Sequence, residues 1–145
     1  MNQTLAKFSL TAIFAVIAGI FGWAGWLVLM VIVCAGVDWV TGTIAAFRKG
    51  LWSSHLAREG IFGKLGMFLA VAASAIFDLL IYLISTNLPM VDLPFSYKTL
   101  LLPLVCIWYI CTELGSILEN AGTLGAPIPS FLKKAIALLK NQTEE

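Results

Sequence analysis

The chain has 145 residues, of which 60% are hydrophobic and only 12% are charged, and its net charge is +1. A soluble domain is closer to half apolar and a quarter charged. The apolar excess lies in runs longer than a globular helix needs, which excludes a large soluble domain and predicts an all-α integral membrane protein. The near-neutral charge, with no base-reading motif and no basic array, gives no support for nucleic-acid binding.

The first apolar segment is long enough for two membrane helices. Phe8–Val37 carries no charge, and the apolar character continues past Asp38 to Phe47. A single span needs roughly 20 residues. Three glycines and two tryptophans between residues 19 and 26 are typical of a break at the membrane interface. We therefore expect spans near residues 5–21 and 23–47.

A cleaved signal peptide is the alternative interpretation of the first span. Lys7 would form its basic start and Val16–Ala18 a cleavage site. The apolar run continues well beyond this site, and no soluble domain follows it. We therefore favour a retained membrane span.

The remaining expected segments follow from charge and turn residues. We expect a polar connection at 48–64, a span at 65–85, a turn-rich loop at 87–97, a span at 99–118 and a basic tail at 130–145. With four spans, nearly all the basic residues fall on one side, which the positive-inside rule assigns to the cytoplasm together with both termini. Three spans are also possible, with Lys7 on the opposite side. The basic residues that set this topology at the membrane surface are Arg48, Lys49, Arg58, Lys64, Lys133, Lys134 and Lys140.

The tail contains a short basic amphipathic segment at 131–140, which predicts a helix. Such a helix can lie on the anionic inner leaflet, where each basic residue contributes roughly 1 kcal/mol. A solvated topology anchor would explain the same pattern.

Three carboxylates fall inside the expected spans: Asp38, Asp78 and Glu113. Each costs about 2.5–3.5 kcal/mol near the centre of a membrane helix, so they should face other helices, face water or be protonated. The helical rise places them at different depths, which predicts no single ring or dyad of acids. They could also be simple hydrogen-bonded packing residues.

Small residues recur every four positions beside two of these acids, at Gly42 after Asp38 and at Ser74 before Asp78. Such stripes allow close helix packing, within one subunit or between subunits. In the last span, two overlapping faces are polar: residues 112, 116 and 119 form one, and residues 113, 116 and 120 the other. The resulting candidates for oligomerisation or a pore are Asp38, Gly42, Ser74, Asp78, Glu113, Ser116, Glu119 and Asn120.

Catalytic and cofactor motifs are absent from the sequence. His55 is the only histidine, and no serine has a histidine at matching depth. The three cysteines, all in apolar runs and without a CxxC, indicate neither a disulfide framework nor a zinc site. We expect no enzyme activity, no metal and no cofactor.

Four motifs in order resemble the toxin-secretion and phage-lysis holin family. They are Asp38-Trp39-Val40-Thr41-Gly42, then Ser53-Ser54 with Arg58-Glu59-Gly60-Ile61 and Lys64, then Glu113–Asn120, and then Gly125-Ala126-Pro127-Ile128-Pro129. Together they extend over most of the chain from residue 38 to residue 129. Thr112 departs from the Asn that the family often has before the Glu, but it keeps a hydrogen-bonding side chain.

The resemblance implies a small phage-derived protein that oligomerises in the bacterial cytoplasmic membrane and forms a timed lesion. That lesion would release an endolysin, or in some relatives a protein toxin, without a fixed contact to it. The implied partners are the lipid bilayer and further copies of the chain. Two alternatives stay open: a small ion or proton-coupled transporter or channel, and an accessory subunit of a larger membrane complex.

Overall fold

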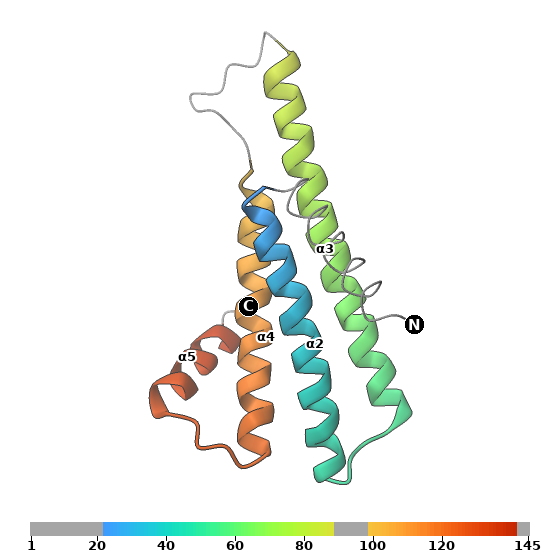
Figure 1. Cartoon of the computed structure of the whole chain (residues 1–145), viewed down its shortest axis with the longest axis vertical. Coiled ribbons are helices and arrows are strands. Elements are labelled where there is room, and N and C mark those ends of the chain that lie inside the picture. Colours follow the sequence, from blue (N-terminus) through green and yellow to red (C-terminus); the bar gives the residue numbers. More distant parts are fainter. Residues whose placement is uncertain (1–21, 89–98, 142–145) are drawn as a thin grey trace, which may run out of the picture.

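The computed structural model describes residues 22–88 and 99–141, and these residues fold into helices joined by short connections. The helices are α2 (Ala24–Arg48), α3 (Ser54–Asn87), α4 (Leu101–Thr123) and α5 (Ser130–Asn141), shown in Figure 1. The first three are each long and apolar enough to cross a membrane. The expectation of an all-α membrane protein is confirmed. The expected span at 5–21 and most of the loop at 87–97 lie outside the described residues.

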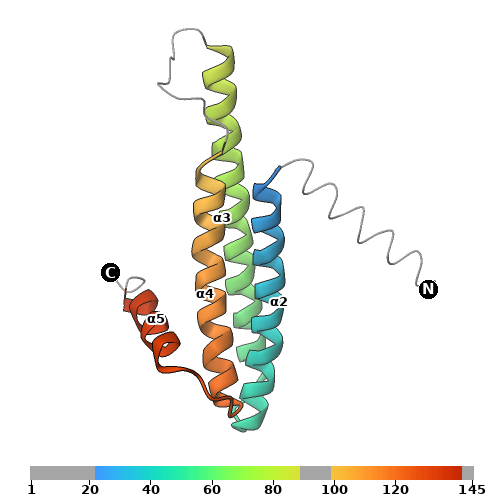
Figure 2. The ribbon, with the colours of Figure 1, turned by 60° about the vertical axis from the view of Figure 1, so that its left-hand side comes forward.

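Helix α4 holds the bundle together. It packs along α2 for most of its length and also against α3, whereas α2 and α3 touch each other much less. Figures 1 and 2 show the three long helices side by side, with α3 extending beyond the other two at one end. The largest fully buried side chains among them are those of Leu102, Val31 and Cys106.

A glycine with positive φ lies at each end of α2. Gly22 has a φ of +56° just before the first turn, and Gly50 has a φ of +66° just after the last. The amide of Leu51 donates to the carbonyl of Ala46 at 3.0 Å, which closes the C-terminus as in a Schellman motif. Positive φ is inexpensive only for glycine, so these two residues set where α2 begins and ends.

Helix α3 begins much earlier than the sequence predicts. The Ser53 hydroxyl accepts a hydrogen bond from the amide of Leu56 at 3.2 Å and caps the helix. The expected polar connection at 48–64 is therefore wrong in extent, because only residues 49–53 link α2 to α3. Polar residues do not interrupt the helix, since Arg58 and Glu59 lie on exposed positions of its first turns. Lys64 consequently lies inside α3, not ahead of it.

Helix α4 also extends past its expected end at 118 and continues to Thr123. Pro103 is accommodated in its first turn, where the backbone N–H has no helical partner. Gly125, which follows the C-cap residue Leu124, has a φ of +97° and turns the chain away from the helix. The amide of Ala126 donates to the carbonyl of Ala121 at 3.0 Å, so the expected Gly/Pro stop terminates the last long helix.

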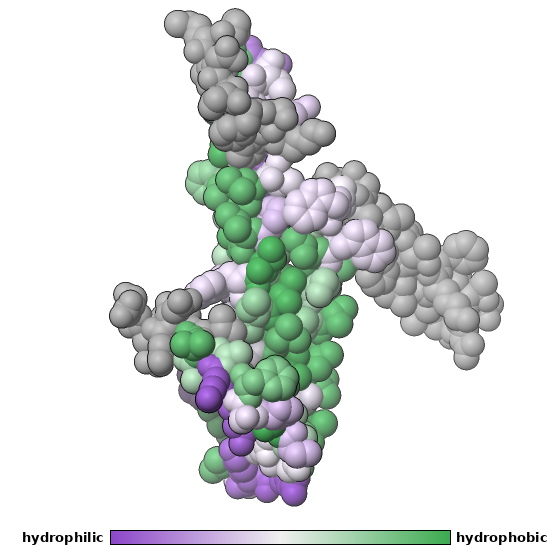
Figure 3. All heavy atoms as spheres, turned by 90° about the vertical axis from the view of Figure 1, so that its left-hand side faces the viewer, coloured by the Kyte–Doolittle hydropathy of each residue, from purple (hydrophilic) through white to green (hydrophobic). Residues whose placement is uncertain are grey.

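The basic tail forms the short helix α5, as predicted for 131–140. It returns beside the half of α4 near the α2–α3 connection (Figure 2). Phe131 and Leu138 are exposed, and so are Lys133 and Lys134. Figure 3 shows an apolar band along the bundle and hydrophilic side chains gathered at the end that carries the α2–α3 and α4–α5 connections.

Candidate functional site

A charged cluster lies between the three long helices. Lys64 of α3 places its Nζ 3.0 Å from Oδ2 of Asp38 on α2 and 2.6 Å from Oε2 of Glu113 on α4. The three side chains are only 11–17% exposed. An isolated charge at such a depth in a bilayer is expensive, and pairing with hydrogen bonds offsets that cost. The cluster joins all three helices through one ammonium group.

An amide completes the cluster. Nδ2 of Asn120 donates to Oδ1 of Asp38 at 3.1 Å and to Oγ1 of Thr41 at 3.2 Å. A Cβ atom at position 42 would lie 3.4 Å from Nδ2, which is van der Waals contact. There is therefore little space for a larger side chain at Gly42 beside this amide.

The helical rise explains why the three charges meet. Asp38 precedes the end of α2 by ten residues, and Lys64 follows the start of α3 by ten residues. At 1.5 Å per residue, both lie about 15 Å from the connection between the helices. The expectation that the acids form no common group is therefore wrong for Asp38 and Glu113, which share Lys64. The two acids share a cation because Lys64 lies inside α3, at the depth of Asp38, and not in a surface loop.

Lys64 is the residue of the candidate site that the sequence analysis placed in the wrong element. A signal was present, since Lys64 follows the apolar and small residues Gly60–Gly63 and directly precedes a long apolar run. A charge with apolar neighbours on both sides along a helix is an intramembrane pattern. Seeing it would have required knowing that the helix begins at Ser54.

Asp78 forms a separate polar contact near the other end of the bundle. Its carboxylate accepts hydrogen bonds from the Thr99 hydroxyl at 2.6 Å and from the amides of Leu100, Leu101 and Leu102 at 2.8–3.2 Å. These amides are the unpaired donors of the first turn of α4. A residue of α3 therefore caps the N-terminus of α4, where a negative charge also interacts favourably with the helix dipole.

The structure separates the other predicted polar residues. Ser74 is buried but donates only to the carbonyl of Val71 in its own helix, at 2.8 Å. The polar face of α4 divides: Glu113 is buried and Asn120 half-buried in the cluster, whereas Glu119 is exposed and Ser116 is half-buried. Only part of the predicted stripe therefore contributes to the charged cluster.

The surface basic residues gather mainly at one end of the bundle. Arg48 donates from its guanidinium to the carbonyl of Leu124, which ties the end of α2 to the end of α4. Lys49 and Arg58 are exposed at this end. The side chain of Lys140 lies outside the described part of the structure.

The described residues offer little that resembles a catalytic or metal centre. His55 faces Glu59 on the exposed first turns of α3, with 3.6 Å between Nδ1 and Oε1. Within residues 22–88 and 99–141, no three His, Cys, Asp or Glu side chains lie close enough together to hold a metal ion. The arrangement is suited to holding membrane helices together through charge.

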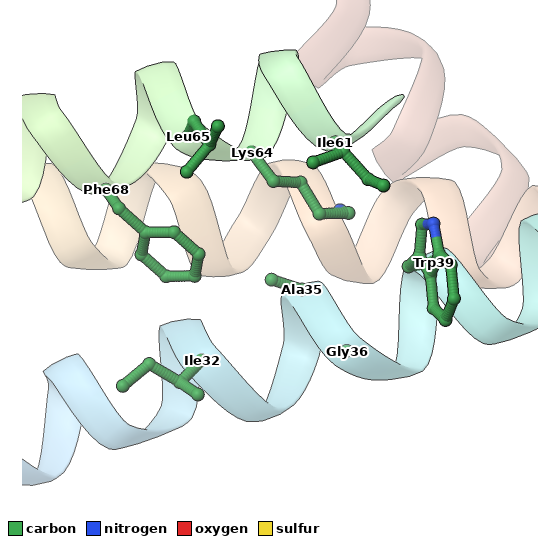
Figure 4. A pocket seen from close by; sticks show the side chains of 8 residues that line it. All are labelled: Ile32, Ala35, Gly36, Trp39, Ile61, Lys64, Leu65 and Phe68. Atoms are coloured by element: carbon green, nitrogen blue, oxygen red, sulfur yellow. The ribbon is translucent and has the colours of Figure 1, made fainter. Parts of the chain in front are cut away.

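An open groove separates α2 from α3 beside the cluster. Ile32, Gly36 and Trp39 form one wall, and Leu65 and Phe68 form part of the other, around a cavity of about 270 Å³. Figure 4 looks into this cavity, with α4 behind it and the Lys64 side chain pointing inward. This α2–α3 groove explains why α3 depends on α4 and on Lys64 for its attachment.

Comparison with known families decides what kind of protein this is. The model of the bacteriophage holin family matches residues 15–141, which include α2 to α5 and the whole charged cluster. This chain belongs to the bacteriophage holin family. With three helices able to cross the bilayer, it is a multi-pass membrane protein of that family.

Curated relatives of this holin-family chain are similar in length and come from bacteria. An uncharacterised protein of Halalkalibacterium halodurans is 29% identical, and the match covers 95% of this chain and 96% of the relative. One from Clostridium perfringens strain 13 is 31% identical over 85% and 82%. One from Listeria monocytogenes is 25% identical over 99% and 92%. No solved structure matches significantly.

Proposed function

We propose that this protein is a working holin, which assembles with further copies of itself in the bacterial cytoplasmic membrane and opens a timed lesion. The family match over residues 15–141 carries the proposal. The internal charge cluster supports the proposal. A protein that lies first in lipid and later lines a water-filled lesion needs polar groups that are shielded from lipid in the first state and exposed to water in the second.

The cluster suggests how the two states differ. In the single subunit, Asp38 and Glu113 share Lys64 and are largely shielded from lipid. Two carboxylates and one ammonium leave one net negative charge when all are ionised, and this residual charge is costly in a bilayer. Water in a lesion would solvate that charge. At high density, subunits would therefore gain free energy by rearranging so that the cluster faces water.

The polar end of the bundle would face the cytoplasm. Exposed basic residues at the α2–α3 connection, such as Lys49 and Arg58, fit the positive-inside rule. Helix α5 would lie on the anionic inner leaflet, with Phe131 and Leu138 in the lipid boundary and Lys133 and Lys134 at the headgroups. Together with the further span expected at 5–21, this orientation would place both termini in the cytoplasm.

The lesion would allow an endolysin, or a secreted toxin, to cross the membrane without a fixed contact to the holin. The test is inducible expression in a bacterium with and without a co-expressed endolysin, following culture turbidity and membrane potential. An abrupt fall in turbidity after a fixed delay, only with endolysin, is the expected result. A membrane potential that stays constant throughout would contradict the proposal. Gradual ion flux without lysis would favour a channel or transporter.

A further inference from the structure

Helix α3 is attached to the bundle along one narrow stripe. Its buried residues are Met67, Val71, Ser74 and Asp78, and Lys64 continues the series by one step toward the start of the helix. The intervals alternate between three and four residues, so these five residues, the α3 stripe, cover only about 80° of the helix circumference. The other described residues of α3 are half-buried or exposed. Packing therefore holds α3 through a small part of its surface.

Polar contacts lie at both ends of the α3 stripe. Lys64 contacts Glu113 of α4 at 2.6 Å, and Asp78, fourteen residues or about 21 Å further along, caps the first turn of α4. Between these ends, Met67 and Val71 offer only apolar surface. Lipid tails are as apolar as such side chains, so burying them against another helix gains little from the hydrophobic effect. The attachment of α3 thus depends strongly on its two polar contacts.

Helices α2 and α4 are joined more extensively, because they pack against each other for most of their length. Polar contacts add to this packing: Asn120 donates to Asp38 and to Thr41. At the polar end of the bundle, Arg48 donates to the carbonyl of Leu124. The described part of the subunit is therefore a closely joined α2–α4 pair with α3 held beside it.

A cavity of about 160 Å³ lies between α2 and α3 at the Lys64 end of the stripe. Trp52 of the α2–α3 connection and Ala57 of α3 line it toward the polar end, and Asp38 and Lys64 line it toward the charged cluster. Water entering there would hydrate the charges and compete with the contacts of Lys64. Asp38 would still accept the amide of Asn120, whereas α3 would lose one of its two polar contacts.

We infer that α3 is the helix that separates from the α2–α4 pair when the subunit opens, and that the α3 stripe then faces the water of the lesion. On α3, the stripe would present the ammonium of Lys64, the hydroxyl of Ser74 and the carboxylate of Asp78. The α2–α4 pair would present the carboxylates of Asp38 and Glu113. Both faces would thus carry groups that water solvates. The lining of a lesion rests on the proposed function, whereas the separation of α3 does not.

Distances between spin labels test the separation of α3 in a single subunit. Leu69 on α3, Val33 on α2 and Ile107 on α4 are exposed, so cysteines at these positions can be labelled without disturbing the core. The three native cysteines are replaced by alanine. One labelled pair is Leu69→Cys with Ile107→Cys, and the control pair is Val33→Cys with Ile107→Cys. Double electron–electron resonance is then recorded with one subunit in each lipid nanodisc.

The two label pairs should respond differently to Lys64→Met. This change breaks a buried ion pair, so a second, longer distance between α3 and α4 should become populated, by about tenfold or more over the unchanged chain. The α2–α4 pair should keep a single distance, although Asp38 and Glu113 then lack their cation. Adding Asp38→Asn and Glu113→Gln removes all charge and should return α3 to its single distance. An unchanged α3–α4 distance in Lys64→Met, or equal broadening of both label pairs, would overturn the separation of α3.

Thiol labelling in cells tests whether the α3 stripe faces water in the lesion. Val71→Cys lies in the stripe, and Ala45→Cys is a matched buried position on the α2 face of Asp38 and Thr41, which contacts α4. After induction without endolysin, a membrane-impermeant methanethiosulfonate is added and the membrane potential is followed. Once the potential falls, Val71→Cys should react about tenfold faster than Ala45→Cys, because only the parting of α3 exposes it.

Two results of the labelling would overturn the assignment of the stripe to the lesion. One is equal reaction of both cysteines, and the other is protection of Val71→Cys after the potential has fallen. A potential that never falls would instead contradict the proposed function. The spin-label distances would in that case still decide whether α3 separates, so the two failures are distinguishable.

Discussion

The ammonium of Lys64 lies 2.6 Å from a carboxylate oxygen of Glu113, although 49 residues separate the two in the chain. The contact joins α3 to α4, and the same ammonium reaches Asp38 on α2. Since α2 and α3 touch each other little, this one side chain carries much of the connection between them.

Replacing Lys64 by methionine should destabilise the subunit and advance lysis. The change leaves two carboxylates together without a cation, and breaking a buried ion pair by removing one partner costs about 3–5 kcal/mol. The net charge of the cluster changes from −1 to −2, which increases the gain from hydration. Unfolding by sodium dodecyl sulfate in mixed micelles measures the stability, and turbidity after induction with endolysin measures the timing.

The matched control for this variant is an uncharged cluster. Lys64→Met combined with Asp38→Asn and Glu113→Gln removes all three charges and should recover most of the stability lost in Lys64→Met. Lysis in the Lys64→Met cells at the wild-type time, with unchanged unfolding, would show that the cluster has no role in either property.

Neutralising one acid should act in the opposite direction on timing. Asp38→Asn or Glu113→Gln leaves Lys64 paired with the remaining carboxylate, so the cluster becomes neutral and gains less from water. Each variant should insert into the membrane normally and delay or abolish lysis, as followed by membrane fractionation and turbidity. Wild-type timing in both would refute a charge-driven opening, and the lesion would then form by packing alone.

Asp78→Ala should loosen the start of α4 selectively. The carboxylate accepts hydrogen bonds from the backbone amides of Leu100, Leu101 and Leu102. Loss of a helix cap lowers the free energy of unfolding by about 1–2 kcal/mol. Amide hydrogen exchange in micelles should become faster at these three residues. Ser74→Ala is the control: it removes a hydroxyl that donates only within α3, so a change of about 0.5 kcal/mol or less is expected. Unchanged exchange in Asp78→Ala would refute the capping role.

A side chain at Gly42 should separate α2 from α4, unlike a side chain at Gly66. A Cβ atom at position 42 meets the Asn120 amide at 3.4 Å, whereas one at position 66 meets no atom within 4 Å. Gly42→Leu should therefore displace Asn120 and cost about 1–3 kcal/mol, while Gly66→Ala should be neutral or stabilising by up to about 1 kcal/mol. Detergent unfolding distinguishes the two, and equal stability of both variants would contradict the close packing at Gly42.

Much of the fold could be predicted from the sequence because helix formation in a membrane depends on local apolar length. The span expected at 65–85 falls within α3, and those expected at 23–47 and 99–118 begin one and two residues before α2 and α4. The Gly/Pro stop after α4 and the helix in the basic tail were recognisable from residue type. The start of α3 was not, since polar residues at 54–64 suggest a loop until the Ser53 cap is seen.

The candidate site could be predicted only in part. Asp38, Glu113 and Asn120 were identified as polar residues on membrane helices, but nothing local shows that they face one cation. Lys64 and Asp78 have their partners on other helices, and which partners they find depends on the register between α3 and its neighbours.

The sequence by itself therefore determined that this is a helical membrane protein. It also determined where the apolar segments end and which polar residues lie within them. Hydropathy and turn residues act within a few positions along the chain, and they suffice for that. Only the tertiary structure decided that three of those groups form one charged cluster and that a groove remains open beside it. Both depend on the depth and rotation of one helix against another, which packing between distant segments sets.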